Sequence, residues 1–255
     1  MTSWADRPRL FVDIETYSGT DIKAGVFKYV EDPAFEILTL QYAWNDEPVD
    51  VIEVSKANYL RIDCDHREVE NCEKIVAALR DPDVVKVAHN TAFERAAFSR
   101  WLVCDMPPEE WEDTMVLAAM NGLPMSLDAA GAALDIEQQK LKEGTALINY
   151  FCKPCRPTIA NGGRTRNRPE HAPDKWERFK AYGTRDVEAM RLIYKKLHRF
   201  PVPDWERRVW ELDARINERG VLVDMDLAQA AIEVDEAFRA EHTEELRKIT
   251  HLENT

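Results

Sequence analysis

Two acids in the first apolar segment of the chain could bind a metal ion together. Residues 10–16 form a short apolar run that contains Asp13 and Glu15. Residues two apart in a strand point to the same face, so we expect both carboxylates to project side by side. Neighbouring carboxylates repel each other unless a divalent cation lies between them. The spacing alone is a weak signal, because it recurs elsewhere in this acidic chain.

Two further acids interrupt apolar faces of predicted helices. Glu94 lies on the apolar face of a helix predicted over residues 91–102, and Asp186 on that of a helix predicted over residues 176–198, one turn after Tyr182. Each acid alone could be solvated or cap a helix. Acids from one strand and two helices could instead converge on one cluster, which is the arrangement that two metal ions require.

The elements that would position these acids belong to the α/β class. Alternating or β-branched residues predict strands over residues 10–16, 37–44, 49–54 and 84–88. Apolar spacing predicts helices over residues 69–79, 91–102, 115–134 in two pieces, 176–198, 205–220 and 227–249. Residues 153–173, rich in Pro and Arg, predict a long loop, and residues 220–224 a short strand or turn. Strands followed by helices and one more strand indicate a mixed sheet flanked by helices.

Composition limits the classes of function. The net charge of −13 argues against a broad basic surface for duplex nucleic acid, although an enzyme acting at a nucleic-acid end stays possible because metal-binding carboxylates make such a site acidic. The five cysteines form no repeated framework and fit a reducing compartment. A zinc site at Cys152 and Cys155 would need two more ligands, and only Cys64 and His66 are candidates. We therefore expect these thiols to bind no metal. Without a long apolar run or signal peptide, we expect a cytoplasmic protein with no membrane contact.

Three motifs in order resemble a known family. They are V-D-I-E-T at residues 12–16, H-N-x-x-F-E at residues 89–94 and Y-x-x-x-D at residues 182–186. This set resembles the tyrosine-containing branch of the DEDD exonuclease superfamily, and more closely the 3′-5′ proofreading domain of family A DNA polymerases (DNA polymerase I), particularly phage-encoded ones. The resemblance covers residues 8–200, and residues 205–224 resemble the start of the polymerase portion.

The resemblance implies an organisation for the whole chain. Residues 1–200 would form an exonuclease domain of ribonuclease-H-like fold, with a five-stranded mixed sheet, and residues 201–255 a helical extension. The implied partners are the 3′ end of single-stranded DNA and a DNA polymerase domain or subunit, on the same chain or a separate one. A phage-encoded protein would work in the host cytoplasm.

The resemblance also implies a role for each site residue. Two Mg²⁺ or Mn²⁺ ions would be held by Asp13, Glu15, Glu94 and Asp186, and Tyr182 would orient the attacking water. The product would be a nucleoside 5′-monophosphate. Thr16, Tyr17 and Asn90 would contact the terminal nucleotide, although the amphipathic ring of Tyr17 could instead pack within the loop. The family usually has Asp where this chain has Glu94, which brings the role of that one ligand into question.

The acid-free stretch from residue 144 to residue 169 has two interpretations. Its arginines could guide a single strand by its phosphates, or the stretch could be a solvated loop. These arginines are Arg156, Arg164, Arg166 and Arg168. Three alternatives also stay open for the chain as a whole. They are an RNA exonuclease of the same superfamily, a catalytically silent DNA-holding module of a polymerase, and a structural α/β domain whose acids point to solvent.

Overall fold

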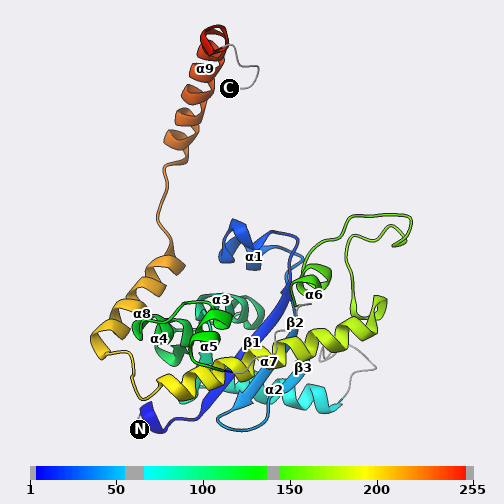
Figure 1. Cartoon of the computed structure of the whole chain (residues 1–255), viewed down its shortest axis with the longest axis vertical. Helices are drawn as coiled ribbons and strands as arrows, with labels where there is room; N and C mark the ends of the chain where they lie inside the picture. Colours follow the sequence, from blue (N-terminus) through cyan, green and yellow to red (C-terminus); the bar gives the residue numbers. More distant parts are fainter. Residues whose placement is uncertain (1–3, 55–65, 137–143, 251–255) are drawn as a thin grey trace. The chain divides into compact units, whose positions relative to one another are not determined.

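The computed structural model describes residues 4–54, 66–136 and 144–250, and a five-stranded sheet forms the core of its larger unit (Figure 1). Its strands are β1 (Arg9–Tyr17), β2 (Glu36–Trp44), β3 (Asp50–Glu53), β4 (Val85–Ala88) and β5 (Trp111–Asp113). They lie in the order β3-β2-β1-β4-β5. β2 is antiparallel to β1 and β3, whereas β4 is parallel to β1 and to β5. This mixed sheet confirms the predicted α/β class and ribonuclease-H-like fold.

Helices follow the strands along the chain. They are α1 (Val26–Glu31), α2 (His66–Arg80), α3 (Thr91–Leu102), α4 (Thr114–Met120), α5 (Leu127–Ala133), α6 (Gly144–Phe151), α7 (Pro173–Leu197), α8 (Asp204–Arg219) and α9 (Met225–Thr250). Short 3-10 turns lie at Trp4–Asp6, Ile22–Ala24, Pro108–Glu110 and Pro169–His171. The long predicted helices are all present. The sequence did not predict α1, α6 or β5, and residues 220–224 form no strand.

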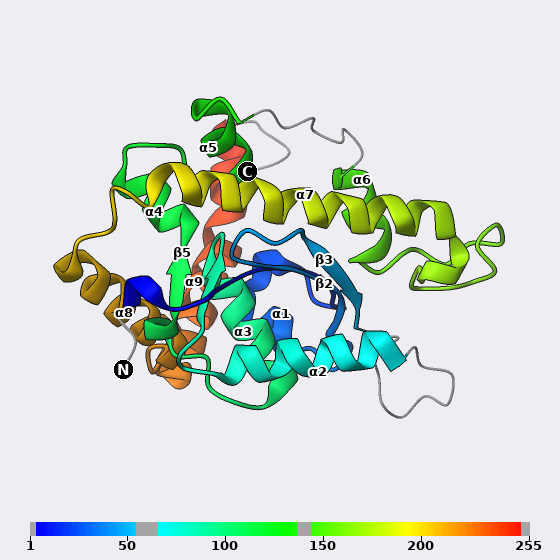
Figure 2. The ribbon, with the colours of Figure 1, turned by 90° about the horizontal axis from the view of Figure 1, so that it is seen from below.

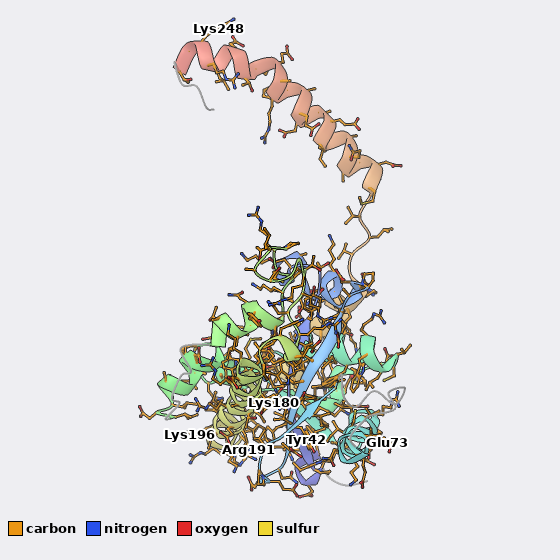
Figure 3. All side chains as sticks on the ribbon, turned by 90° about the vertical axis from the view of Figure 1, so that its right-hand side faces the viewer. Tyr42, Glu73, Lys180, Arg191, Lys196 and Lys248 are labelled. Carbon is orange, nitrogen blue, oxygen red and sulfur yellow. The ribbon has the colours of Figure 1, made fainter. Side chains whose placement is uncertain are left out.

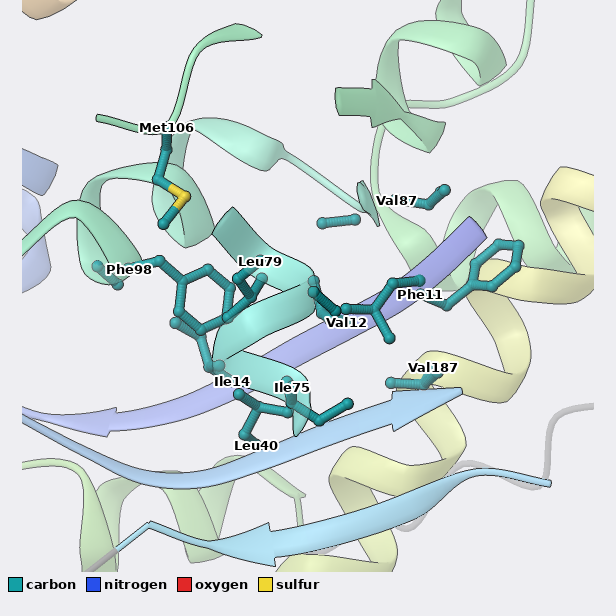
Figure 4. Close-up of a cluster of buried hydrophobic side chains, with 14 of the residues drawn as sticks. Phe11, Val12, Ile14, Leu40, Ile75, Leu79, Val87, Phe98, Met106 and Val187 are labelled. Carbon is teal, nitrogen blue, oxygen red and sulfur yellow. The ribbon is translucent and has the colours of Figure 1, made fainter. Parts of the chain in front are cut away.

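The sheet is covered on both sides by helices. Figure 2 shows α7 along one side and α2 and α3 along the other. Between the sheet and these helices lies an apolar cluster, part of which Figure 4 draws. It includes Phe11, Val12, Ile14, Leu40, Ile75, Leu79, Val87, Phe98, Met106 and Val187. Val12 and Ile14 are buried here, as the alternation along β1 predicted.

Polar contacts and a glycine hold α7 against the sheet. Nζ of Lys180 donates to Oε1 of Glu53 at 2.7 Å, and Arg191 donates to the carbonyl of Glu47; both α7 side chains are labelled in Figure 3. At Gly183 the helix comes so close to β2 that a Cβ would lie 2.5 Å from Nε2 of Gln41. This close approach brings the middle of α7 to the sheet, where Tyr182 and Asp186 are needed.

The chain divides into two compact units, residues 1–211 and residues 212–255. The first contains the sheet and its flanking helices, and the second contains the end of α8 and all of α9. The predicted boundary between residues 200 and 201 stays a prediction. Among the described helices, none is both long and apolar enough to cross a membrane.

Candidate active site

Asp13 and Glu15 lie on the central strand beside an irregularity in its pairing. The register between β1 and β2 shifts between Glu15 and Thr16. Such bulges re-aim side chains and are frequent next to active sites. Asp13 lies opposite Gln41, which α7 covers at Gly183, and Glu15 is only 8% exposed. The alternation of β1 therefore directs both acids toward α7.

The four predicted acids interact electrostatically. Burial and then the charge of Asp186 raise the pKa of Asp13 well above its ordinary value. Burial followed by Asp13 and Asp186 raises the pKa of Glu15 in the same way. Burial and then Asp13 also raise the pKa of Glu94. Acids from β1, α3 and α7 thus converge around Asp13, so the alternative in which they point separately to solvent is wrong.

Glu94 supplies evidence that the cluster fits a divalent ion. Its side chain is 4% exposed, and its Oε2 accepts no hydrogen bond from any described residue. A buried, unpaired carboxylate oxygen is costly, and a cation or a water on that cation would satisfy it. Carboxylate oxygens are also the donors that Mg²⁺ and Mn²⁺ prefer. Within the described part of the chain, no three His, Cys, Asp or Glu side chains are already gathered closely enough to form a metal site.

Tyr182 is tied to Asp186 at the edge of this cluster. The two side chains share a hydrogen bond, and burial raises the pKa of Asp186 to about 6. Burial and then the charge of Asp186 raise the pKa of Tyr182, so its phenol stays protonated at neutral pH. A neutral phenol can donate to a water or a carboxylate but cannot act as a general base.

Cys152 is a neighbour of the acids that the sequence did not reveal. Its Sγ donates to Oε2 of Glu15 at 3.7 Å, and burial and then Glu15 raise the pKa of this thiol. Cys152 and Cys155 are both free. Cys64, which a zinc site would require, lies outside the described residues. Cys152 therefore acts here as a weak donor that holds one oxygen of Glu15.

A cavity of about 360 Å³ opens beside Glu15. Its lining includes Thr16, Tyr29, Phe93 and Lys153. Thr16 is buried, and its Oγ1 lies 2.9 Å from the hydroxyl of Tyr29. The volume falls at the lower end of the range for small-ligand sites, roughly 300–1,000 Å³.

Tyr17 and Arg166 are engaged with each other, which favours the packing alternative for Tyr17 and corrects the prediction that Arg166 guides a strand. The ring of Tyr17 is 6% exposed within a cluster of apolar side chains, and the Arg166 guanidinium lies 3.8 Å from its centroid. Arg166 also donates to Oε2 of Glu36 at 2.6 Å. The guanidinium covers one face of the Tyr17 ring and little of the ring is exposed, so a base could not stack on it. Arg166 already forms an ion pair with Glu36.

The loop that carries Arg166 is an ordered structure. The amide of Cys155 donates to the carbonyl of Thr165 at 2.7 Å, and the buried Asn167 donates to the carbonyl of Tyr150 at 3.0 Å. Nε of Arg164 donates to Oδ1 of Asn167 at 2.9 Å. These contacts argue against disorder, but most residues of the loop are exposed, so the solvated interpretation stays open beside the phosphate-guiding one. Of the predicted arginines, Arg156 and Arg168 have exposed side chains.

Asn90 precedes α3 in a left-handed conformation, with φ of 73° and ψ of 60°. Its side chain is exposed and makes no cap hydrogen bond to the helix. Non-glycine residues in this region are uncommon and concentrate at functional sites. The side chain of Asn90 is thus exposed, while its backbone amide donates to Asp113, a residue that the sequence did not single out.

The chain resembles several known structures and one curated protein. Brucella melitensis NrnC bound to pGG is 13% identical, with a TM-score of 0.42 over 81% of this chain and 79% of that one. The family B DNA polymerase of Pyrobaculum calidifontis is 14% identical, with a TM-score of 0.43 over 76% of this chain and 25% of the polymerase. Escherichia coli RNase D, an exoribonuclease, is 19% identical, with a TM-score of 0.39 over 85% of this chain and 46% of that one.

Sequence similarity is much stronger to a phage protein. Over 246 residues, 96% of this chain, the sequence is 42% identical to a DNA polymerase of Bacillus phage SP02. The chain spans 36% of the length of that polymerase. No family model matches the chain. The polymerase relative confirms the resemblance to a DNA polymerase that the three motifs predicted.

Proposed function

We propose that this chain is the proofreading portion of a DNA polymerase, a 3′-5′ exonuclease that releases nucleoside 5′-monophosphates from single-stranded or frayed DNA ends. The observation that carries the proposal is the convergence of acids from β1, α3 and α7 around Asp13: the charge of Asp186 raises the pKa of Asp13, and the charge of Asp13 raises the pKa of Glu15 and of Glu94. Repulsion among buried carboxylates destabilises a protein that binds no metal, whereas a site for divalent cations requires such a cluster of carboxylates. Similarity to a phage DNA polymerase supports DNA as the substrate and a polymerase domain as the partner.

The acids divide the work of holding the ions. Asp13 interacts electrostatically with Glu15, Asp186 and Glu94, so it would take part in holding both ions. Glu15 and Asp186 would complete one ion's ligands, and Glu94 would support the other. Two Mg²⁺ or Mn²⁺ ions, once bound there, would stabilise the developing charge on the attacking and leaving oxygens of the displacement. The unpartnered Oε2 of Glu94 supports a ligand role despite the longer side chain.

The remaining residues would orient the substrate. Tyr182, neutral and hydrogen-bonded to Asp186, would donate to or align the water that attacks the last phosphodiester. The terminal nucleotide would occupy the cavity beside Glu15, with Thr16 in its wall. Asn90 offers its exposed amide from the N-terminus of α3.

Digestion of labelled strands tests the proposal. A 5′-labelled single-stranded DNA and the RNA of the same sequence are incubated with Mg²⁺ or Mn²⁺ and the wild-type chain, with Asp13→Asn and EDTA as controls. We expect a ladder that shortens DNA from its 3′ end and disappears in both controls. Faster digestion of the RNA would favour the RNA exonuclease. No digestion by folded wild-type protein would favour the silent DNA-holding module.

A further inference from the structure

The Asp113 side chain joins the N-termini of two helices. It lies at the end of β5, immediately before α4, and is 8% exposed. Its Oδ1 accepts hydrogen bonds from the amide of Asn90 at 3.0 Å and from the amide of Met115 at 2.8 Å. Its Oδ2 accepts from the amide of Thr91 at 2.9 Å and from Oγ1 of Thr91 at 3.1 Å. One buried carboxylate thus satisfies donors at the starts of both α3 and α4.

Helix α3 depends on the Asp113 carboxylate because the side chain of its own N-cap residue accepts no hydrogen bond from the helix. The first amides of a helix have no partner within the helix and need an acceptor from elsewhere. Asn90 occupies the cap position, but its left-handed backbone leaves its side chain without a cap hydrogen bond. Asp113 supplies the missing acceptor, and its negative charge is favoured at the positive ends of two helix dipoles.

The anchored end of α3 carries Glu94. Because α3 begins at Thr91, Glu94 lies in the first helical turn, directly beyond the amides that Asp113 holds. The Glu94 side chain is buried, and its Oε2 has no described partner, so no other described hydrogen bond fixes that oxygen. The placement of Glu94 relative to Asp13 therefore depends on where the helix end is held.

We propose that Asp113 is a positioning residue for Glu94, which fixes the start of α3 and thereby the affinity of the ion that Glu94 supports. This inference rests on the proposed function. Supporting residues that orient metal ligands change metal affinity by about 10- to 100-fold when they are mutated. Asp113→Asn keeps the shape of the side chain but replaces one acceptor oxygen by an NH₂ group, which would face an amide donor.

The test measures metal dependence. Wild type, Asp113→Asn and Thr91→Val are titrated with Mn²⁺, following both DNA digestion and the rise in melting temperature that the metal causes without DNA. Thr91→Val removes only the hydroxyl that donates to Asp113 and keeps the side-chain volume. Ser126→Ala is the matched control, because it removes the cap hydrogen bond of α5, from Ala129, and leaves α3 untouched.

We expect the variants at Asp113 and Thr91 to need more Mn²⁺ than wild type, and to reach the maximal rate of wild type once Mn²⁺ is saturating. We expect Asp113→Asn to need about tenfold more Mn²⁺ for half-maximal digestion and for half of the thermal shift, and Thr91→Val to need about two- to fivefold more. Ser126→Ala should titrate like wild type. If Asp113 acts through Glu94, then Glu94→Gln combined with Asp113→Asn should lose no more activity than Glu94→Gln alone.

Two outcomes would overturn different claims. An active, metal-dependent wild type whose metal requirement is unchanged in both Asp113→Asn and Thr91→Val would overturn the positioning role alone. A folded wild type with neither digestion nor a metal-induced thermal shift would overturn the proposed function, and this inference with it. If Asp113→Asn does not fold, the titration of Thr91→Val decides.

Discussion

The ring of Tyr182 lies directly against the backbone of Gly144. A Cβ built at Gly144 would come within 2.5 Å of Cε2 and 2.9 Å of Cδ2 of that ring, closer than real contacts allow. Only a glycine at the first residue of α6 therefore leaves Tyr182 its present place, from which its hydroxyl reaches Asp186. The N-terminus of α6 therefore contacts Tyr182 and limits where its ring can lie in the candidate active site.

Substitution of Gly144 should therefore lower the rate of digestion. Gly144→Ala must displace the Tyr182 ring, and misplacement of a reacting group by about 1 Å can cost up to about 100-fold in rate. We expect kcat to fall at least about tenfold, with a much smaller change in KM. Thr145→Ala, at the exposed next position, is the control. If Gly144→Ala is as active as the control, the contact between Gly144 and Tyr182 is not required for activity.

Gly183 should be essential for stability rather than for chemistry alone. Its Cβ would lie 2.5 Å from Nε2 of Gln41, a fully buried side chain that donates to Thr39. We expect Gly183→Ala to lower the free energy of unfolding by about 1–3 kcal/mol, because overpacking a filled interface costs that much. Urea denaturation measures it. Adding Gln41→Ala should restore part of the stability, and the absence of any rescue would argue that the clash lies elsewhere.

Without metal, the contribution of Asp186 to the stability of the protein should fall as the pH rises through the acidic range. The folded pKa of Asp186 is about 6, above its ordinary value of 3.8, so the folded state holds this proton more tightly than the unfolded state. Its contribution to stability is therefore most favourable below about pH 3.8 and is lost as the pH rises to about 6.

The variant Asp186→Asn isolates this effect. In EDTA at pH 7.5 we expect it to be more stable than wild type by about 1–3 kcal/mol, with the difference shrinking toward pH 4. Saturating Mn²⁺ should reverse the order, because only wild type keeps the carboxylate that holds the ion. A difference that is independent of pH and metal would mean that Asp186 lies outside the acid cluster.

The loop of residues 153–173 should contribute to DNA binding through its exposed cations. Arg156 and Arg168 are exposed, whereas Arg166 covers Tyr17 and binds Glu36. If Arg156 or Arg168 binds a phosphate, its alanine variant should reduce the slope of log affinity against log salt by about 0.7 for each phosphate that is no longer neutralised. Arg166→Ala should instead lower the melting temperature. An unchanged slope in both exposed variants would leave the loop without a role in binding.

Long, strongly patterned elements were predictable from the sequence, and short ones were not. β1 and β2 have nine residues each, and α7 has 25, enough for apolar periodicity to appear. β5 has three residues and α1 has six, too few to show a period of 2.0 or 3.6. Burial of Glu94 was predictable because its helix face repeats over several turns.

Interactions between distant residues account for what the sequence did not reveal about the site. Cys152 reaches Glu15 across 137 positions of sequence, and Asp113 reaches Asn90 across 23, with no local pattern to mark either pair. From the sequence, Tyr17 could contact the nucleotide or pack within the loop, and Arg166 could bind a phosphate or be solvated. In the fold the same chemistry lets them bind each other.

The most direct test of the central claim is the fate of solvent oxygen during digestion. Single-stranded DNA is digested by the wild-type chain with Mn²⁺ in ¹⁸O-enriched water, and the released nucleotides are analysed by mass spectrometry beside Asp13→Asn and EDTA controls. Hydrolysis from the 3′ end predicts deoxynucleoside 5′-monophosphates with one ¹⁸O in the phosphate, absent from both controls. Release of 3′-monophosphates, or no mononucleotide from folded protein, would contradict the account.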